Sequence, residues 1–145
     1  FSQAKQLKKW VEKENAFIVN NSYTFSFFGR KRRLPEAAAS NKGVAAHAIR
    51  SGFNFLIQSV ASDINLLGLI DLIEWVKAEK LEDKIRIFAT VHDSIVCECS
   101  EDMIPEYSRK LKQCLQKDRG ISIPGKAIGV DIEVGPSWGE VKKVA

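Results

Sequence analysis

The stretch "IRIFATVHDSIVCE", residues 85–98, decides the fold that we expect for this chain. Before the histidine, apolar and other residues alternate, with Ile85, Ile87, Ala89 and Val91 on one side and Arg86, Phe88 and Thr90 on the other. After it, Ile95, Val96 and Cys97 again favour a strand. The pattern predicts two strands joined by a tight turn at His92, Asp93 and Ser94.

Asp93 is the candidate functional residue of this turn. A tight turn between two half-buried strands places a carboxylate at the rim of a sheet, where it can bind a metal ion. Aspartate is also a common turn former with no further role. The residues of the turn alone leave both interpretations open.

The remaining periodicity predicts an α+β domain. Apolar residues at helical spacing predict helices over residues 2–15, 44–51, 53–80 and 101–117, with a break at Gly52. A hairpin is expected in "YTFSFFGRKRRLP", residues 23–35, and a last strand in "AIGVDIEVG", residues 127–135. We therefore expect a small antiparallel sheet with helices packed on one face, preceded by an N-terminal helix and a basic hairpin.

Composition favours a folded domain with an anionic partner. The chain has 145 residues, of which 45% are hydrophobic, and its formal net charge is +4. Three cysteines cannot form a complete disulfide framework, and nothing resembles a secretory leader, so we expect a cytoplasmic protein. Polar residues interrupt the apolar stretch 53–76, which predicts a buried helix and no membrane span.

Two groups of residues are candidates for nucleic-acid contacts. The first is the basic cluster of the hairpin, formed by Arg30, Lys31, Arg32 and Arg33. The second is a row of hydrogen-bond donors at four-residue spacing, formed by Arg50, Asn54 and Gln58. A duplex minor groove presents acceptors at every base pair, so such a row can test base pairing without reading sequence. Alternatively, the amides of Asn54 and Gln58 cap or bridge helices.

Taken together, the motifs resemble a known enzyme family. "FGRKRRLP", "R-x-x-x-N-x-x-x-Q-x-x-A-x-D-I", "VHD" on a strand turn and the closing "VGPSWGE" occur in the order and approximate spacing of the C-terminal part of family A DNA polymerases, the bacterial polymerase I and phage replicative group. The resemblance covers nearly the whole chain. It implies that residues 1–40 form the helix and basic hairpin at the edge of the fingers, and that residues 41–145 belong to the palm.

The resemblance also implies roles for the candidate residues. Asp93 would be one of two metal-binding aspartates that share two Mg²⁺ ions, and His92 would lie against the primer terminus. The donor row would face the minor groove of newly formed pairs, and the basic cluster, chiefly Arg30, would meet backbone phosphate. The implied partners are primer-template DNA, an incoming dNTP and the N-terminal part of the polymerase.

Two departures from the family pattern qualify the expected activity. Ser94 stands where the usual His-Asp-Glu triplet has glutamate, as in single-subunit phage-type RNA polymerases and some phage DNA polymerases. The family's second metal aspartate and the nucleotide-binding fingers helix precede the segment that this chain resembles. A single carboxylate cannot hold two metal ions, so we expect this chain alone to be inactive, as a fragment or as one piece of a split polymerase. A non-catalytic nucleic-acid-binding module and a self-associating fragment are the competing hypotheses.

Overall fold

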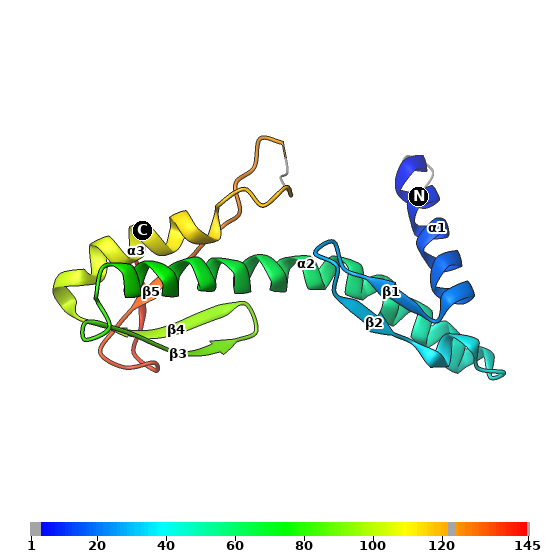
Figure 1. Ribbon diagram of the computed structural model, residues 1–145, viewed down its shortest axis with the longest axis horizontal. Helices are drawn as coiled ribbons and strands as arrows, with labels where there is room; N and C mark the ends of the chain where they lie inside the picture. The colour runs from blue at the N-terminus through cyan, green and yellow to red at the C-terminus, as the bar shows by residue number, and fades with distance from the viewer. Residues whose placement is uncertain (1–3, 122–123, 145) are drawn as a thin grey trace. The chain divides into compact units, whose positions relative to one another are not determined.

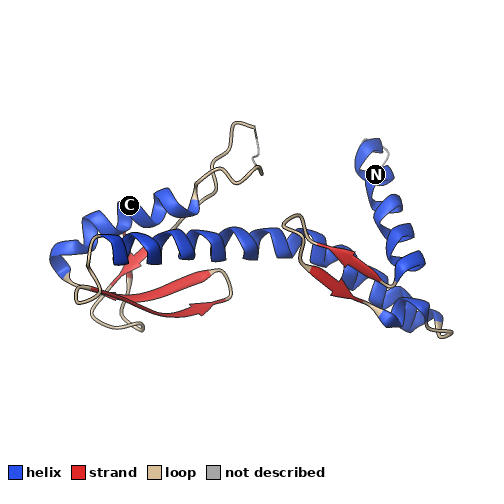
Figure 2. Ribbon diagram, in the orientation of Figure 1, coloured by secondary structure: helices blue, strands red, loops and turns tan. Residues whose placement is uncertain are grey.

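The computed structural model describes residues 4–121 and 124–144, and its elements are shown in Figures 1 and 2. In chain order they are α1 (Lys5–Asn21), β1 (Tyr23–Phe25), β2 (Lys31–Arg33), the 3-10 helix η1 (Pro35–Ala38), α2 (Lys42–Ala78), β3 (Ile85–Val91), β4 (Ser94–Cys99), the 3-10 helix η2 (Glu101–Met103), α3 (Ile104–Leu115), β5 (Ile132–Val134) and β6 (Lys142–Val144). The chain divides into two compact units, residues 1–63 and 64–145, and α2 contributes residues to both. The expected α+β class is confirmed.

Helix α2 is continuous over 37 residues, so the predicted break at Gly52 is wrong. The helix begins where the Asn41 side chain accepts hydrogen bonds from the backbone N–H groups of Gly43 and Val44, at 2.9 and 3.2 Å. Gly52 lies inside the helix because neighbouring side chains approach its backbone closely. A Cβ at this position would collide with Leu34 and lie 2.9 Å from Ile18. The glycine therefore serves packing and does not interrupt the helix.

Residues 1–63 form the first unit, in which the predicted hairpin is confirmed. β1 and β2 pair antiparallel, with Tyr23 opposite Arg33 and Phe25 opposite Lys31. Helix α1 runs to Asn21, six residues beyond the expected end, and Ser22 closes it in the left-handed conformation. A small core unites the helices and η1 through Ile18, Leu34, Ala37 and Ala48. Figure 2 shows the hairpin beside the N-terminal part of α2.

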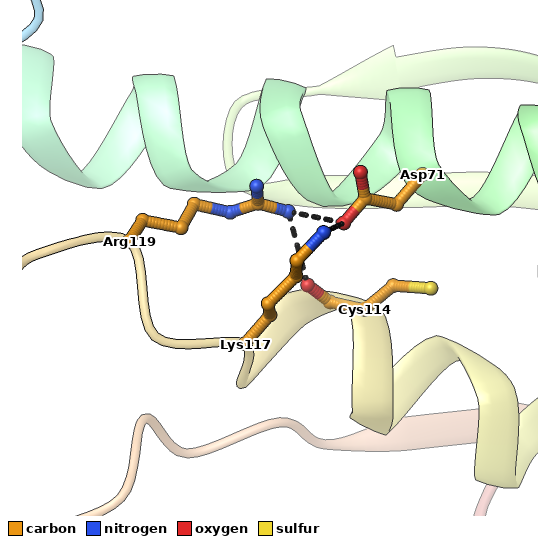
Figure 3. A network of polar contacts seen from close by, with 4 residues as sticks. All are labelled: Asp71, Cys114, Lys117 and Arg119. Carbon is orange, nitrogen blue, oxygen red and sulfur yellow. Dashed lines mark hydrogen bonds and ion pairs between the residues drawn. The ribbon is translucent and has the colours of Figure 1, made fainter.

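Residues 64–145 form the second unit around a larger core. Its buried members come from α2, β3, η2, α3 and β5: Leu72, Val76, Ile85, Met103, Tyr107, Leu111, Cys114 and Ile132. Ile87, Ile95, Cys97 and Cys99 pack against this cluster from the β3–β4 hairpin. Leu72 and Val76 are thus the residues through which α2 contributes to this core. Asp71 of α2 also forms ion pairs with Lys117 and Arg119, which follow α3 (Figure 3).

Strand β3 contains a β-bulge that the alternation did not predict. Ile87 pairs with Cys97 and Ala89 pairs with Val96, so Phe88 has no partner across the hairpin. Cross-strand partners share a face, so Ala89 and Val91 lie on the opposite face from Ile85 and Ile87. The prediction that these four residues share one face is therefore wrong. Phe88 is 63% exposed.

The sheets are smaller than expected. In the described ranges the strands form three separate two-stranded antiparallel sheets, β1–β2, β3–β4 and β5–β6. The last predicted strand shortens to β5, where Ile132 pairs with Val144 of the unpredicted β6. The hydrophobic face of β5 still reaches the core, because Ile132 is buried.

Much of the apolar surface of α2 is exposed, so the prediction of a buried helix is wrong for this chain. Within the described residues, α2 is the helix that is long and apolar enough to cross a membrane, and 22% of its most apolar window is buried. Ile57, Leu66 and Ile70 are 57%, 42% and 50% exposed. The chain supplies too few elements to cover this helix.

Candidate functional site

The predicted turn carries His92 and Asp93 as a two-residue hairpin loop. Val91 pairs with Ser94 across the strands, so only His92 and Asp93 lie between them. His92 has a φ of 56°, the left-handed region that favours glycine at the first position of such loops. His92, Asp93 and Ser94 are all exposed. The turn therefore presents an imidazole and a carboxylate to solvent at the end of a paired hairpin.

Asp93 fits a role as one ligand of a divalent cation but does not form a complete site. Its carboxylate makes no hydrogen bond or ion pair with any other described residue, so both oxygens are free to bind. The described part of the chain contains no group of three or more His, Cys, Asp or Glu side chains that could hold a metal. A site with three or more His, Cys, Asp or Glu ligands would need residues from outside the described part of the chain.

The predicted donor row is continuous and accessible. Because α2 does not break, Arg50, Asn54 and Gln58 keep their four-residue spacing along one helix, and all three are exposed. The structure gives none of the three a hydrogen bond to another described residue. The alternative in which Asn54 and Gln58 cap or bridge helices therefore has no contact to support it in the described chain.

The four residues of the basic cluster have different surroundings. Arg30 forms an ion pair with Asp63, at 2.8 Å between Nη2 and Oδ1. Arg32 donates a hydrogen bond to the Ser51 hydroxyl, at 2.8 Å. Lys31 lies over the Tyr23 ring, with Nζ 3.7 Å from the ring centroid.

Arg33 differs from these three residues. It is exposed, and its side chain makes no ion pair, hydrogen bond or cation-π contact with another described residue. Its guanidinium is therefore available to a partner, while those of Arg30 and Arg32 are engaged with α2.

The partners that α2 offers to the hairpin were not predicted from the sequence. Ser51, Phe55 and Asp63 follow one another at multiples of four residues, which places them along one row of the helix. The guanidinium carbons of Arg30 and Arg32 lie 5.6 and 5.5 Å from the Phe55 ring centroid. The four-residue spacing is the available signal, but in the sequence Asp63 stands out only as the aspartate of the motif "R-x-x-x-N-x-x-x-Q-x-x-A-x-D-I" and as a polar residue in the apolar stretch 53–76.

The cysteines of the second unit are packing residues. Burial raises the pKa of all three thiols, Cys97, Cys99 and Cys114, and raises that of Cys99 to about 11. Burial also raises the pKa of Tyr107, which lies in the same core. Thiols with raised pKa values are poor nucleophiles and poor metal ligands near neutral pH.

Comparison with known proteins identifies the family. The family description "DNA polymerase family A" matches residues 1–140 of the chain. The chain belongs to DNA polymerase family A. Among its family A relatives, the DNA polymerase of Escherichia phage T5 is 46% identical over 131 residues, covering 90% of this chain and 15% of that protein. The DNA polymerase I of Chloroflexus aurantiacus is 27% identical over 146 residues, covering 100% of this chain and 15% of that protein.

A solved family A structure has the same fold. The POL domain of Pol1 from M. smegmatis, in complex with DNA primer-template and dNTP, matches with a TM-score of 0.68 and 28% identity. The match covers 75% of this chain and 19% of that one. The chain thus spans about 15% of the length of the curated relatives named above and 19% of the solved chain. The expected division of these residues between fingers and palm at residue 40 stays a prediction.

Proposed function

We propose that the chain is the C-terminal segment of a template-directed family A DNA polymerase and that it serves nucleotidyl transfer to a primer. The observation that carries the proposal is the exposed His92–Asp93 loop, whose carboxylate is free of contacts, in a chain that matches the family over residues 1–140. The proposed partners are primer-template DNA and a dNTP, which are present in the solved POL domain of M. smegmatis. We also propose that the protein acts in the cytoplasm.

Asp93 would contribute one carboxylate ligand to the two Mg²⁺ ions of the polymerase. Bound divalent cations of this kind activate an attacking hydroxyl and neutralise the charge of phosphate groups. A rigid two-residue loop suits the ligand role, because pairing of Val91 with Ser94 fixes the backbone on both sides. His92, next to the carboxylate, would contact the primer terminus. The chain by itself would be inactive, because one carboxylate cannot hold two ions.

The first unit would bind the duplex without reading its sequence. Asn54 and Gln58 would donate hydrogen bonds to purine N3 and pyrimidine O2 in the minor groove, which every base pair offers. Arg50 would extend the same row, and Arg33 would contact backbone phosphate. Phosphate contacts position the protein, while groove contacts inspect the base pairs. The chain alone would therefore bind duplex DNA with an affinity that falls steeply as salt rises.

Substitution of Asp93 in the complete polymerase tests the proposal. Asp93→Asn keeps the size of the side chain and removes the charge that a hard cation requires, so nucleotide addition should fall by about three or more orders of magnitude. Ser94→Ala is the matched control in the same exposed loop and should retain most of the activity. Duplex binding and the circular dichroism spectrum should be unchanged in both variants. Near-normal turnover of Asp93→Asn in magnesium, or equal damage from Ser94→Ala, would refute the metal role.

A further inference from the structure

Arg30 and Arg32 attach the basic hairpin to one row of residues on α2, formed by Ser51, Phe55 and Asp63. Arg30 pairs with Asp63, Arg32 bonds to Ser51, and both guanidinium groups lie over the ring of Phe55 between them. These three α2 residues span 12 positions of the helix, or about 18 Å at 1.5 Å per residue. The hairpin therefore contacts the first residue of the row, the last residue, and Phe55 between them.

Asp63 is more enclosed than the arginine that it binds. Its side chain is 12% exposed, while that of Arg30 is 50% exposed. One oxygen pairs with Arg30, and the other, Oδ2, is buried and has no hydrogen-bond partner in the described chain. An enclosed carboxylate is costly without its cation. The pair therefore depends on the hairpin being docked.

The end of the hairpin is also fixed locally, so that Arg30 has a defined position. Ser26 is buried, its backbone N–H donates to the Arg30 carbonyl at 2.8 Å, and its hydroxyl accepts from the Arg30 N–H at 3.0 Å. The backbone from which the Arg30 side chain extends is thus held by two hydrogen bonds. Loss of the ion pair would loosen this end of the hairpin from α2, while the hydrogen bond from Arg32 to Ser51 remains.

The attached row adjoins the donor row. Arg50, Asn54 and Gln58 directly precede Ser51, Phe55 and Ser59, and Ser59 lies between Phe55 and Asp63 at the same four-residue spacing. One residue corresponds to a rotation of about 100° around the helix. A hairpin docked on one row consequently lies beside the other. Its docking sets the position of Arg33, whose guanidinium has no hydrogen bond or ion pair with a described residue, relative to the donor row.

We propose that Asp63 and Arg30 are positioning residues, which lock the basic hairpin beside the donor row, and that Arg30 is not the residue that contacts phosphate. Arg33 makes the phosphate contact from the docked hairpin. The second statement rests on the proposed duplex binding, whereas the locking of the hairpin does not.

Two measurements on the purified chain separate these statements. Hydrogen exchange without DNA reports hairpin docking through the amides of residues 23–33. Asp63→Asn and Arg30→Gln should each speed this exchange by about tenfold, the scale of a hydrogen bond to a charged group. The double variant should exchange no faster than the quicker single variant. Ser51→Ala removes the hydroxyl that accepts from Arg32 and is a milder change, so it should also speed exchange of these amides. This variant replaces Asp63→Asn in the test if Asp63→Asn does not fold.

Fluorescence anisotropy with a labelled primer-template duplex tests the phosphate assignment across a salt series. Arg33→Gln, the matched loss of one cation, should make the slope of log affinity against log salt shallower by about 0.9. Arg30→Gln and Asp63→Asn should weaken binding and leave the slope unchanged. Unchanged hairpin exchange in Asp63→Asn and Ser51→Ala would overturn the locking role, and an Arg30→Gln slope as shallow as that of Arg33→Gln would overturn the phosphate assignment. Absence of duplex binding in every variant would refute the assignment of phosphate contact to Arg33 along with the proposed function, while the exchange result would still decide the lock.

Discussion

Asp71 should be the most sensitive polar residue of the second unit, and Asp71→Asn tests this (Figure 3). Its Oδ2 accepts from Lys117 Nζ and from Arg119 Nη2, both at 2.9 Å. The Lys117 side chain is 58% exposed, whereas that of Arg119 is 11% exposed. Without the Asp71 charge, Arg119 keeps only the Cys114 carbonyl at 3.3 Å, and its Nε is buried with no partner in the described residues.

The expected cost follows from the different exposure of the two cations. A hydrogen bond to a charged group is worth about 1.5–3 kcal/mol, and an exposed ion pair is worth about 0–1 kcal/mol. Asp71→Asn should therefore lower the free energy of unfolding by about 2–3 kcal/mol, and Lys117→Met by less than about 1 kcal/mol. Urea titration followed by fluorescence measures both. A loss below about 0.5 kcal/mol for Asp71→Asn, or an equal loss for Lys117→Met, would refute the reasoning.

The same residue predicts a pH dependence. The hydrogen bond from Lys117, followed by the hydrogen bond and charge of Arg119, lowers the pKa of Asp71 below its ordinary value, and burial opposes them in part. A carboxyl group with a lowered folded pKa contributes stability above its unfolded pKa of about 3.9 and loses it as pH falls through the folded pKa. The stability difference between the wild-type chain and Asp71→Asn should be constant from about pH 5 to 7 and shrink below about pH 4. A difference that persists unchanged in acid would contradict this assignment.

Two further predictions concern the second unit. A Cβ at Gly135 would collide with the backbone of Glu140 and lie 2.8 Å from Val141 Cα, so Gly135→Ala should destabilise the β5–β6 hairpin by about 1–3 kcal/mol, whereas Gly139→Ala, which meets no atom within 4 Å, should not. Hydrogen exchange of residues 132–144 measures this, and equal exchange in the two variants would contradict it. Because burial raises the pKa of Cys99 to about 11, its thiol should react with a disulfide reagent at pH 7.5 about a hundredfold more slowly than an ordinary thiol, with the rate rising as pH increases. A rate equal to that of the urea-unfolded chain would show that the thiol is not protected.

Local patterns were sufficient to predict most elements of the fold. Helical spacing predicted α1, α2 and α3, and the two hairpins around Gly29 and Asp93 follow from alternation interrupted by turn residues. These predictions succeed because each element buries one face against its own unit. The spacing of its apolar residues can therefore be recognised within a short stretch of sequence. The end of α1 was predicted six residues early, and Phe17, Ile18 and Val19 continue the helix.

Contacts between distant residues could not be predicted in this way. Asp71 and Arg119 are 48 residues apart, and no local sequence pattern links the two residues. Gly52 would be read as a helix breaker from propensity alone, yet its place is decided by Ile18 and Leu34, which approach from other elements. The bulge at Phe88 is likewise a property of pairing and not of β3 by itself. Tertiary packing overrode local preference at each of these positions.

The turn of the candidate site also contains a residue, His92, whose backbone conformation is unfavourable for folding. A non-glycine residue with positive φ costs about 1 kcal/mol, and histidine is among the residues that tolerate it best. His92 has this conformation at a φ of 56°, while the residue is exposed and its side chain makes no hydrogen bond, ion pair or ring contact with another described residue. No polar contact within the described residues therefore offsets the strain, and glycine would adopt this conformation more easily. We infer that the histidine is kept for what its side chain does outside this chain, which agrees with the proposed contact to a primer terminus.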